Sequence, residues 1–126
     1  MYKYYREIST GKHFCFASEI CNSFGVYSNK NKPYVRFFTY FYDEYCKITG
    51  IDKDRLYYKT QNGLVRVFPE LSAIASFAIC IGHELKHNND NDNNRITIKI
   101  SDKSFNIVVD VIRFKNTYEK MLGVKI

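Results

Sequence analysis

Residues 64–87 constrain this chain most, because they join a short strand directly to a long apolar helix. Residues 64–68 are predicted to form a strand, and Pro69 is predicted to open a helix that runs to about His87. That helix ends in His83-Glu84-Leu85-Lys86-His87, a literal H-E-x-x-H pattern. Any account of the chain must therefore explain a buried helix and a pair of imidazoles at its end.

Three pairs of strands are expected around this helix. Residues 4–8 and 13–17 are predicted to form a β-hairpin about the turn at 9–12. A second hairpin is predicted from residues 56–59 and 64–68, because Asn62-Gly63 in its turn tolerates positive φ at both positions. Residues 95–100 alternate strictly between polar and apolar, and with a strand at 105–114 they predict a C-terminal hairpin.

The helices are predicted from capping residues and from apolar spacing. A short helix is expected over residues 19–24, with Ser18 as N-cap and Gly25 at its end. A longer helix over 34–48 follows Pro33 and closes at Gly50. Its apolar stripe, predicted to face the core, consists of Val35, Phe38, Phe41, Tyr42, Tyr45 and Ile48. With a short helix at 115–122, the chain is predicted to have an α+β fold.

Length and composition indicate one domain over residues 1–126. Residues 88–94 are all Asn or Asp, and we expect a mobile loop there. No long uncharged apolar run and no secretory signal are present, so the sequence predicts an intracellular protein without a membrane span. The four cysteines contain no C-x-x-C pair and are expected to stay reduced, with Cys15, Cys46 and Cys80 in the core.

Several motifs resemble the KilA-N domain, a DNA-binding domain of viruses and phages that is related to fungal APSES domains. These motifs are Phe14-Cys15-Phe16-Ala17-Ser18-Glu19-Ile20-Cys21, Arg36-Phe37-Phe38, Gly50-Ile51-Asp52, Val67-Phe68-Pro69-Glu70-Leu71 and Ile74-Ala75-Ser76-Phe77. The similarity covers about residues 4–80 and leaves the hairpin and helix in 95–126 unexplained. It implies a KilA-N-like core of two hairpins with short and long helices, and a nucleic-acid-binding module from a DNA virus, phage or low-GC mobile element.

The charge distribution favours the same function. The net charge is +6, and residues 1–36 carry six Lys and Arg side chains against two Glu. A basic surface attracts DNA through phosphate contacts. The candidate contacts lie on the first turn, the polar loop at 28–33 and the second hairpin, and they are Lys12, His13, Lys30, Lys32, Arg36, Lys59 and Arg66. Binding to duplex DNA in a regulatory or virus–host role is the expected function.

A zinc-dependent metallopeptidase is an alternative that the H-E-x-x-H pattern leaves open. In such enzymes two histidines one helical turn apart bind zinc, and the glutamate between them is the general base. His83 and His87 would be the ligands and Glu84 the base, and Glu119 is our choice for the third ligand. An ordinary helix end explains the same residues, because Lys86 and His87 near a helix C-terminus complement its dipole.

A protein-binding adaptor or inhibitor is the remaining alternative. At two positions where the KilA-N pattern has Asn and Lys, this chain has Phe16 and Glu19. Their replacement is compatible with a domain that binds a host or phage protein instead of DNA. A homodimer is compatible with either function.

Overall fold

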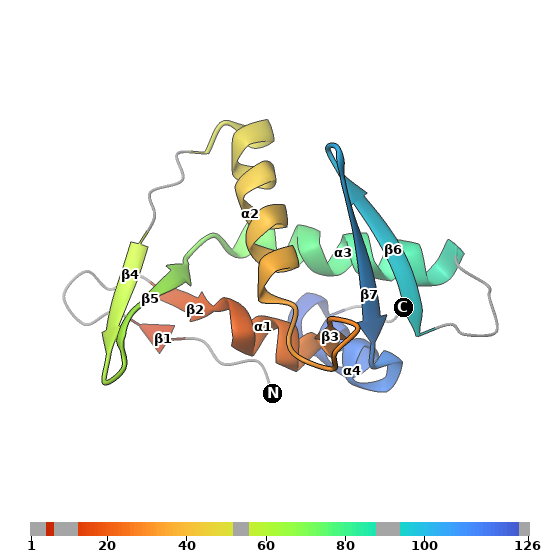
Figure 1. The fold of residues 1–126 in the computed structure, drawn as a ribbon, viewed down its shortest axis with the longest axis horizontal. Coiled ribbons are helices and arrows are strands. Elements are labelled where there is room, and N and C mark those ends of the chain that lie inside the picture. Colours follow the sequence, from red (N-terminus) through yellow and green to blue (C-terminus); the bar gives the residue numbers. More distant parts are fainter. Residues whose placement is uncertain (1–4, 7–12, 52–55, 88–93, 124–126) are drawn as a thin grey trace.

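The computed structural model describes residues 5–6, 13–51, 56–87 and 94–123, which form a mixed α+β fold (Figure 1). The helices are α1 (Ala17–Phe24), α2 (Val35–Thr49), α3 (Leu71–His87) and α4 (Val111–Leu122). The strands are β1 (Tyr5–Arg6), β2 (His13–Phe16), β3 (Val26–Tyr27), β4 (Leu56–Thr60), β5 (Gly63–Phe68), β6 (Arg95–Ile100) and β7 (Lys103–Val109). The predicted fold class is confirmed. None of the described helices is long and apolar enough to cross a membrane.

The strands form two antiparallel sheets. In the first, the order β1-β2-β5-β4 joins the two predicted N-terminal hairpins, because Cys15 pairs with Phe68 and Phe16 with Val67. In the second, the order is β3-β7-β6. All three predicted strand pairs are present, although the first turn at 9–12 and the Asn-rich segment at 88–93 lie outside the described residues.

The turn of the β4–β5 hairpin differs from the predicted one in its details. Thr60 pairs with Gly63, so Gln61 and Asn62 form the loop. Positive φ occurs at Gly63, at 117°, and not at Asn62. The Thr60 hydroxyl donates a hydrogen bond to the Gly63 carbonyl at 2.9 Å and accepts one from the Asn62 N–H at 3.2 Å. The side chain of Thr60 therefore stabilises a turn that needs the left-handed region only at glycine.

The helix ends were predicted better than the helix starts. Gly25 and Gly50 end α1 and α2 in the left-handed conformation, as expected. The predicted cap by Ser18 is wrong, since α1 begins at Ala17 and its N-cap residue, Phe16, makes no side-chain cap. In α3, the Glu70 carbonyl accepts the first hydrogen bonds, so the helix starts after Pro69 rather than at it.

The predicted strand at 105–114 is wrong beyond Val109. The side chain of Asp110 accepts a hydrogen bond from the Arg113 N–H at 3.2 Å and thereby caps α4, which starts at Val111. The apolar side chains in residues 111–114 led to the prediction that the strand continues. The Asp110 side chain instead accepts a hydrogen bond from a backbone N–H that has no partner in the first turn of a helix, and this favours the helix. The expected helix at 115–122 is the later part of α4.

Strand β3 had not been predicted, and it links the C-terminal elements to the rest of the chain. Val26 pairs with Val109, and the Asp110 N–H donates to the Gly25 carbonyl at 2.8 Å. Gly25 has a φ of 65°, and a Cβ there would lie 2.8 Å from the Asp110 Cβ. The Thr117 hydroxyl of α4 donates to the Ser23 carbonyl of α1. Residues 95–123 therefore pack directly on α1 and β3.

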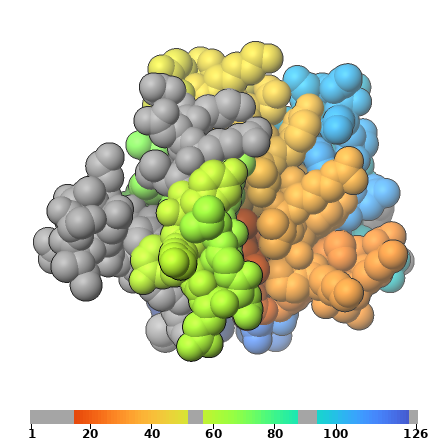
Figure 2. Space-filling view, turned by 60° about the vertical axis from the view of Figure 1, so that its left-hand side comes forward, coloured from red at the N-terminus to blue at the C-terminus, as the bar shows by residue number. Residues whose placement is uncertain are grey.

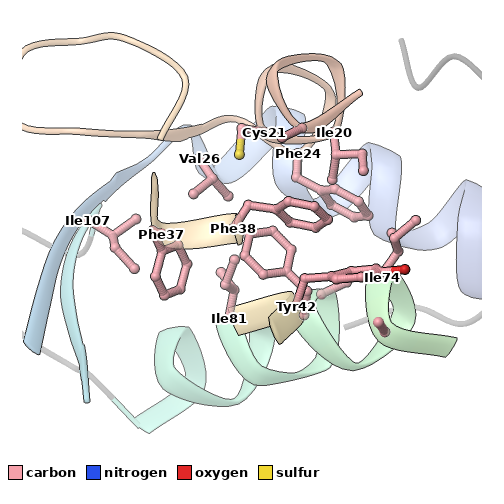
Figure 3. Packing of buried hydrophobic residues seen from close by; sticks show 14 of the residues in the cluster. Ile20, Cys21, Phe24, Val26, Phe37, Phe38, Tyr42, Ile74, Ile81 and Ile107 are labelled. Carbon is pink, nitrogen blue, oxygen red and sulfur yellow. The ribbon is translucent and has the colours of Figure 1, made fainter. Parts of the chain in front are cut away.

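Aromatic side chains of α2 form the centre of the hydrophobic core (Figure 3). Phe37 contacts Phe105 of β7 and Phe77 of α3, with ring centroids 5.2 and 5.3 Å apart. Phe38 contacts the same Phe77 at 4.9 Å and Phe68 of β5 at 5.0 Å. Helix α2 thus touches both sheets, and in Figure 1 it stands between the two long hairpins.

This position corrects the predicted core stripe of α2. Phe38 and Tyr42 are buried as predicted, and Phe41 and Tyr45 are partly buried. Val35 is 40% exposed and Ile48 is 80% exposed, so these two predictions are wrong. Phe37, which the stripe had excluded, is fully buried. The C-terminal sheet covers a second side of α2. The predicted stripe assumed that only one side of the helix is buried, and it therefore left out Phe37.

The four cysteines are free thiols. Cys15 and Cys46 are buried as predicted, whereas Cys80 is only partly buried. Cys21 is fully buried as well, and desolvation raises its thiol pKa to about 12 despite a hydrogen bond to the Tyr34 carbonyl. Cys21 is therefore a protonated core residue at neutral pH.

Candidate nucleic-acid interface

Three of the predicted contacts lie where the loop at 28–33 enters α2. The loop is closed by hydrogen bonds from the Ser28 N–H to the Lys32 carbonyl at 2.8 Å and from the Asn31 N–H to the Ser28 carbonyl at 3.0 Å. Asn31 adopts positive φ, at 59°, which short polar side chains tolerate. Lys30, Lys32 and Arg36 are all exposed. A compact loop therefore holds two lysines beside the first turn of a helix that adds an arginine.

The loop is anchored at both ends. The Tyr34 N–H donates to the Val26 carbonyl at 3.1 Å, and Pro33 forms an isolated bridge with Tyr27. Among the described residues, none forms an ion pair with Lys30, Lys32 or Arg36. These three side chains are therefore available to an anionic partner. The backbone of the loop that carries them is held against β3 at the edge of the second sheet.

The β4–β5 hairpin carries the next predicted contact, Lys59. Lys59 is exposed and lies opposite Leu64 in the register. The hairpin is exposed on both faces from 57 to 65 except at Thr60, which is intermediate. At its base the ring of Tyr58 meets Phe16 edge-on at 6.1 Å. The hairpin therefore projects from the molecule and presents Lys59 to solvent.

Arg66, the seventh predicted contact, is held within the protein. Its guanidinium forms an ion pair with Asp43 of α2, with N–O distances of 2.6 and 3.4 Å. The guanidinium carbon also lies over the Phe68 ring at 4.9 Å and the Tyr42 ring at 5.9 Å. The two charged side chains are only 15% and 20% exposed. This bridge ties β5 to α2 and sets the orientation of the hairpin relative to the helix.

The energetic coupling between Arg66 and Asp43 is testable. Because the pair is largely shielded from water and bidentate, we expect a coupling energy of about 1 to 3 kcal/mol. The measurement is a double-mutant cycle with Arg66→Met, Asp43→Asn and the double variant, each unfolded in urea. Strictly additive changes in the free energy of unfolding would show that the bridge does not hold the hairpin.

The structure does not describe the side chains of the two remaining predicted contacts, Lys12 and His13. Lys12 lies outside the described residues. The backbone of His13 belongs to β2 and pairs with Arg6, and its side chain is outside the description. Of the predicted contacts, Lys30, Lys32, Arg36 and Lys59 are therefore the exposed candidates among the described side chains, and Arg66 is paired with Asp43. In Figure 2 the β4–β5 hairpin, in lime green, and the segment with the loop and the start of α2, in orange, come forward on the same side of the molecule.

The H-E-x-x-H residues lie in the last turns of α3. His83 and His87 are exposed, with ring centroids 4.3 Å apart, and Glu84 is partly buried. Two imidazoles this close can chelate one metal ion. In the part of the chain that the structure describes, however, no group of three or more His, Cys, Asp or Glu side chains is arranged to hold a metal. Glu119, on α4, is therefore not placed as a third ligand.

Glu84 and His87 also line a pocket that sequence reasoning missed. Its volume is about 600 Å³, and its polar lining comprises Asn29, Glu84, His87, Arg95, Thr97 and Asn106. Thr97 and Asn106 lie opposite each other on β6 and β7 and are joined by a 2.9 Å hydrogen bond. The pocket combines residues from the 28–33 loop, α3, β6 and β7, and no local sequence pattern indicates such a combination.

Zinc content tests the metallopeptidase alternative. Because a catalytic zinc requires three protein ligands, we expect protein purified without chelator or affinity tag to carry zinc well below one ion per chain. Elemental analysis of the wild type and of His83→Ala makes the measurement. Stoichiometric zinc in the wild type that is lost in His83→Ala would restore the peptidase alternative, and Glu84→Gln would then be the control in a peptidase assay.

Comparisons of the chain with protein-family models, with curated proteins and with solved structures gave no match. The function is therefore inferred from the geometry and charge of the described residues and from the motifs in the sequence.

Proposed function

We propose that this chain binds duplex DNA, mainly through the phosphate backbone, with the surface formed by the 28–33 loop, the first turn of α2 and the β4–β5 hairpin. The observation that supports this most is the set of four exposed cations on these elements, Lys30, Lys32, Arg36 and Lys59. The resemblance to the KilA-N domain points to the same ligand. A regulatory or virus–host role is part of the proposal.

The arrangement suits phosphate contacts better than it suits base recognition. Lysine side chains are flexible point charges, which fit phosphates without fixing a base pattern. Binding releases the counterions that surround DNA, and this release supplies most of the binding free energy. The affinity should therefore fall as the salt concentration rises. We therefore expect similar affinities for duplexes of unrelated sequence.

Arg66 has an indirect role in this proposal. Its ion pair with Asp43 fixes the base of the hairpin against α2 and so keeps Lys59 at a constant position relative to Arg36. The guanidinium is a positioning group, because it is largely buried and both of its terminal nitrogens donate to the Asp43 carboxylate. Loss of the bridge would then weaken DNA binding through the orientation of the hairpin rather than through a lost phosphate contact.

Fluorescence anisotropy with labelled duplexes tests the proposal. Two duplexes of equal length and unrelated sequence should bind at low salt with affinities that agree within a small factor. Absence of binding to both, by a protein whose circular dichroism shows it to be folded, would reject DNA as the ligand and leave the adaptor alternative. A strong preference for one duplex would reject the phosphate-dominated mechanism but not DNA binding.

A further inference from the structure

We infer that the DNA-binding surface continues across α2 onto the β6–β7 hairpin, where Lys103 makes a further phosphate contact. The inference rests on the proposed function and extends it to the C-terminal hairpin, which the resemblance to the KilA-N domain does not cover. Lys103 is the first residue of β7, is exposed, and forms no ion pair with a described residue. Its place is set by the register of the hairpin and by one aromatic ring of α2.

The register of the hairpin puts Lys103 on the face that packs against α2. Residues directly opposite each other in an antiparallel pair share a face, and successive residues alternate between the two faces. Ile98 pairs with Phe105, and both are buried in the core. Two positions further along each strand, Ile100 pairs with Lys103. Lys103 therefore belongs to the inner face of the hairpin, at its end, where the side chain reaches solvent.

Tyr40 of α2 positions the Lys103 side chain. The ammonium nitrogen lies over the Tyr40 ring, 5.2 Å from its centroid, and a cation at this distance is attracted to the face of the ring. The same ring meets Phe105 at 5.5 Å, which holds it against β7. An ammonium group has three N–H donors, so Lys103 can lie over the ring and still donate to a phosphate oxygen.

Tyr40 also connects Lys103 to the proposed surface. Arg36 and Tyr40 are four residues apart on α2, a spacing that places two Cβ atoms about 6 Å apart on one face of a helix. Lys103 is therefore the next cation after Arg36 along this face. In Figure 2 the β6–β7 hairpin, in blue, comes into view beside α2 on the side of the molecule that carries the 28–33 loop.

This face of α2 lies between the two long hairpins. Arg36 and Asp43 are seven residues apart, which is about two helical turns, so they share the face with Tyr40. Asp43 contacts β5 through its ion pair, and Tyr40 contacts β7. A DNA backbone that follows this face would meet Lys59 on one side of α2 and Lys103 on the other.

The first test neutralises one lysine on each face of the same hairpin. Lys103→Met removes the charge and keeps the aliphatic part of the side chain over Tyr40. Lys99→Met is the matched control, because Lys99 is exposed and pairs with Ser104, which puts it on the outer face. We expect Lys103→Met to lower the affinity for duplex DNA about 5- to 10-fold near physiological salt, and Lys99→Met to lower it less than about 2-fold.

The salt dependence gives a second measure of the same contact. Loss of one phosphate contact reduces the slope of the logarithm of the association constant against the logarithm of the salt concentration by about one. We expect this reduction in Lys103→Met and not in Lys99→Met. A fifth contact also makes the slope of the wild type steeper by about one than four contacts alone would give.

The outcomes separate this inference from the proposed function. Binding of DNA with equal affinity by the wild type and Lys103→Met would overturn the inference and leave the proposed function in place. Equal losses in Lys103→Met and Lys99→Met would also overturn it, because only net charge would then matter. Absence of DNA binding by the folded wild type would reject the proposed function and the inference with it. Circular dichroism and thermal unfolding of each variant check that its fold is retained.

A carboxylate beside Tyr40 provides a test of opposite sign. Partial desolvation, the Asp102 charge and the Glu44 charge raise the pKa of the Tyr40 hydroxyl, so both carboxylates act at this ring. A phosphate bound at Lys103 would be repelled by Asp102. We therefore expect Asp102→Asn to raise the affinity about 2- to 3-fold, and Glu119→Gln on α4 to leave it nearly unchanged. An equal gain in the two variants would contradict a phosphate at this position.

Acetylation of lysines with and without bound duplex locates the contact directly. The reaction is followed by mass spectrometry of proteolytic fragments, at equal reagent concentration and time. DNA should protect Lys103 and should leave the reaction of Lys99 unchanged. Equal rates at Lys103 with and without DNA, under conditions in which anisotropy shows a saturated complex, would overturn the inference.

Discussion

Reversing the charges of Lys32 and Arg36 together is expected to lower the affinity for duplex DNA about 100-fold near physiological salt. Each phosphate contact contributes roughly a factor of ten under these conditions through counterion release, and the double variant Lys32→Glu/Arg36→Glu removes two. Both side chains are exposed and make no ion pair with a described residue, so the fold should be unaffected. Anisotropy titration of one duplex, at one salt concentration, gives the measurement.

The matched control is Lys115→Glu/Lys120→Glu on α4. It changes the net charge by the same amount on two residues that are also exposed but outside the proposed surface. We expect this control to weaken binding only by the small, long-range effect of net charge, which salt screens. Equal losses in the two double variants would contradict the proposed surface, because they would show that only the total charge matters.

Truncation of Phe38 to alanine is expected to lower the free energy of unfolding by about 3 to 5 kcal/mol. Phe38 is fully buried and its ring meets Phe68 of β5 at 5.0 Å and Phe77 of α3 at 4.9 Å. Removal of the ring therefore leaves a cavity where helix, helix and sheet meet. Urea unfolding of the variant, compared with the wild type, measures the loss.

Ile48→Ala is the control for this prediction, since both residues belong to the apolar stripe of α2 that the sequence analysis assigned to the core. Because Ile48 is 80% exposed, its truncation should change the free energy of unfolding by less than about 0.5 kcal/mol. A loss at Ile48 as large as that at Phe38 would mean that a further surface covers the end of α2.

Local patterns were sufficient for most elements of this fold. Gly25 and Gly50 mark the helix ends because their left-handed backbone is cheap only for glycine, and both ends were predicted. The alternation in residues 95–100 predicted a half-buried strand, and Ile96 and Ile98 are the buried residues of that strand. In each case the signal and the structure lie within a few residues of each other, so no tertiary information was needed.

Some of the features that were missed depend on contacts between distant segments. Strand β3 is two residues long and exists because β7, more than eighty residues later, pairs with it. The start of α4 was missed for a local reason, since the cap by Asp110 was outweighed by the apolar residues after it.

The candidate site was predicted in part for the same reasons. Exposed lysines in a polar loop, such as Lys30 and Lys32, are visible in the sequence, and the structure places both at the surface. The partner of Arg66 was not visible, because Asp43 is 23 residues away and only the packing of β5 on α2 brings the two together. A basic residue in a strand looks the same in sequence whether it faces solvent or a carboxylate.

The salt dependence of DNA affinity tests the central claim most directly. For a complex held by four cations on phosphates, a plot of the logarithm of the association constant against the logarithm of the salt concentration should be linear, with a slope of about −3 to −4. The double variant at Lys32 and Arg36 should reduce the steepness by about two. Absence of DNA binding at low salt, or an affinity that does not change with salt, would contradict the account.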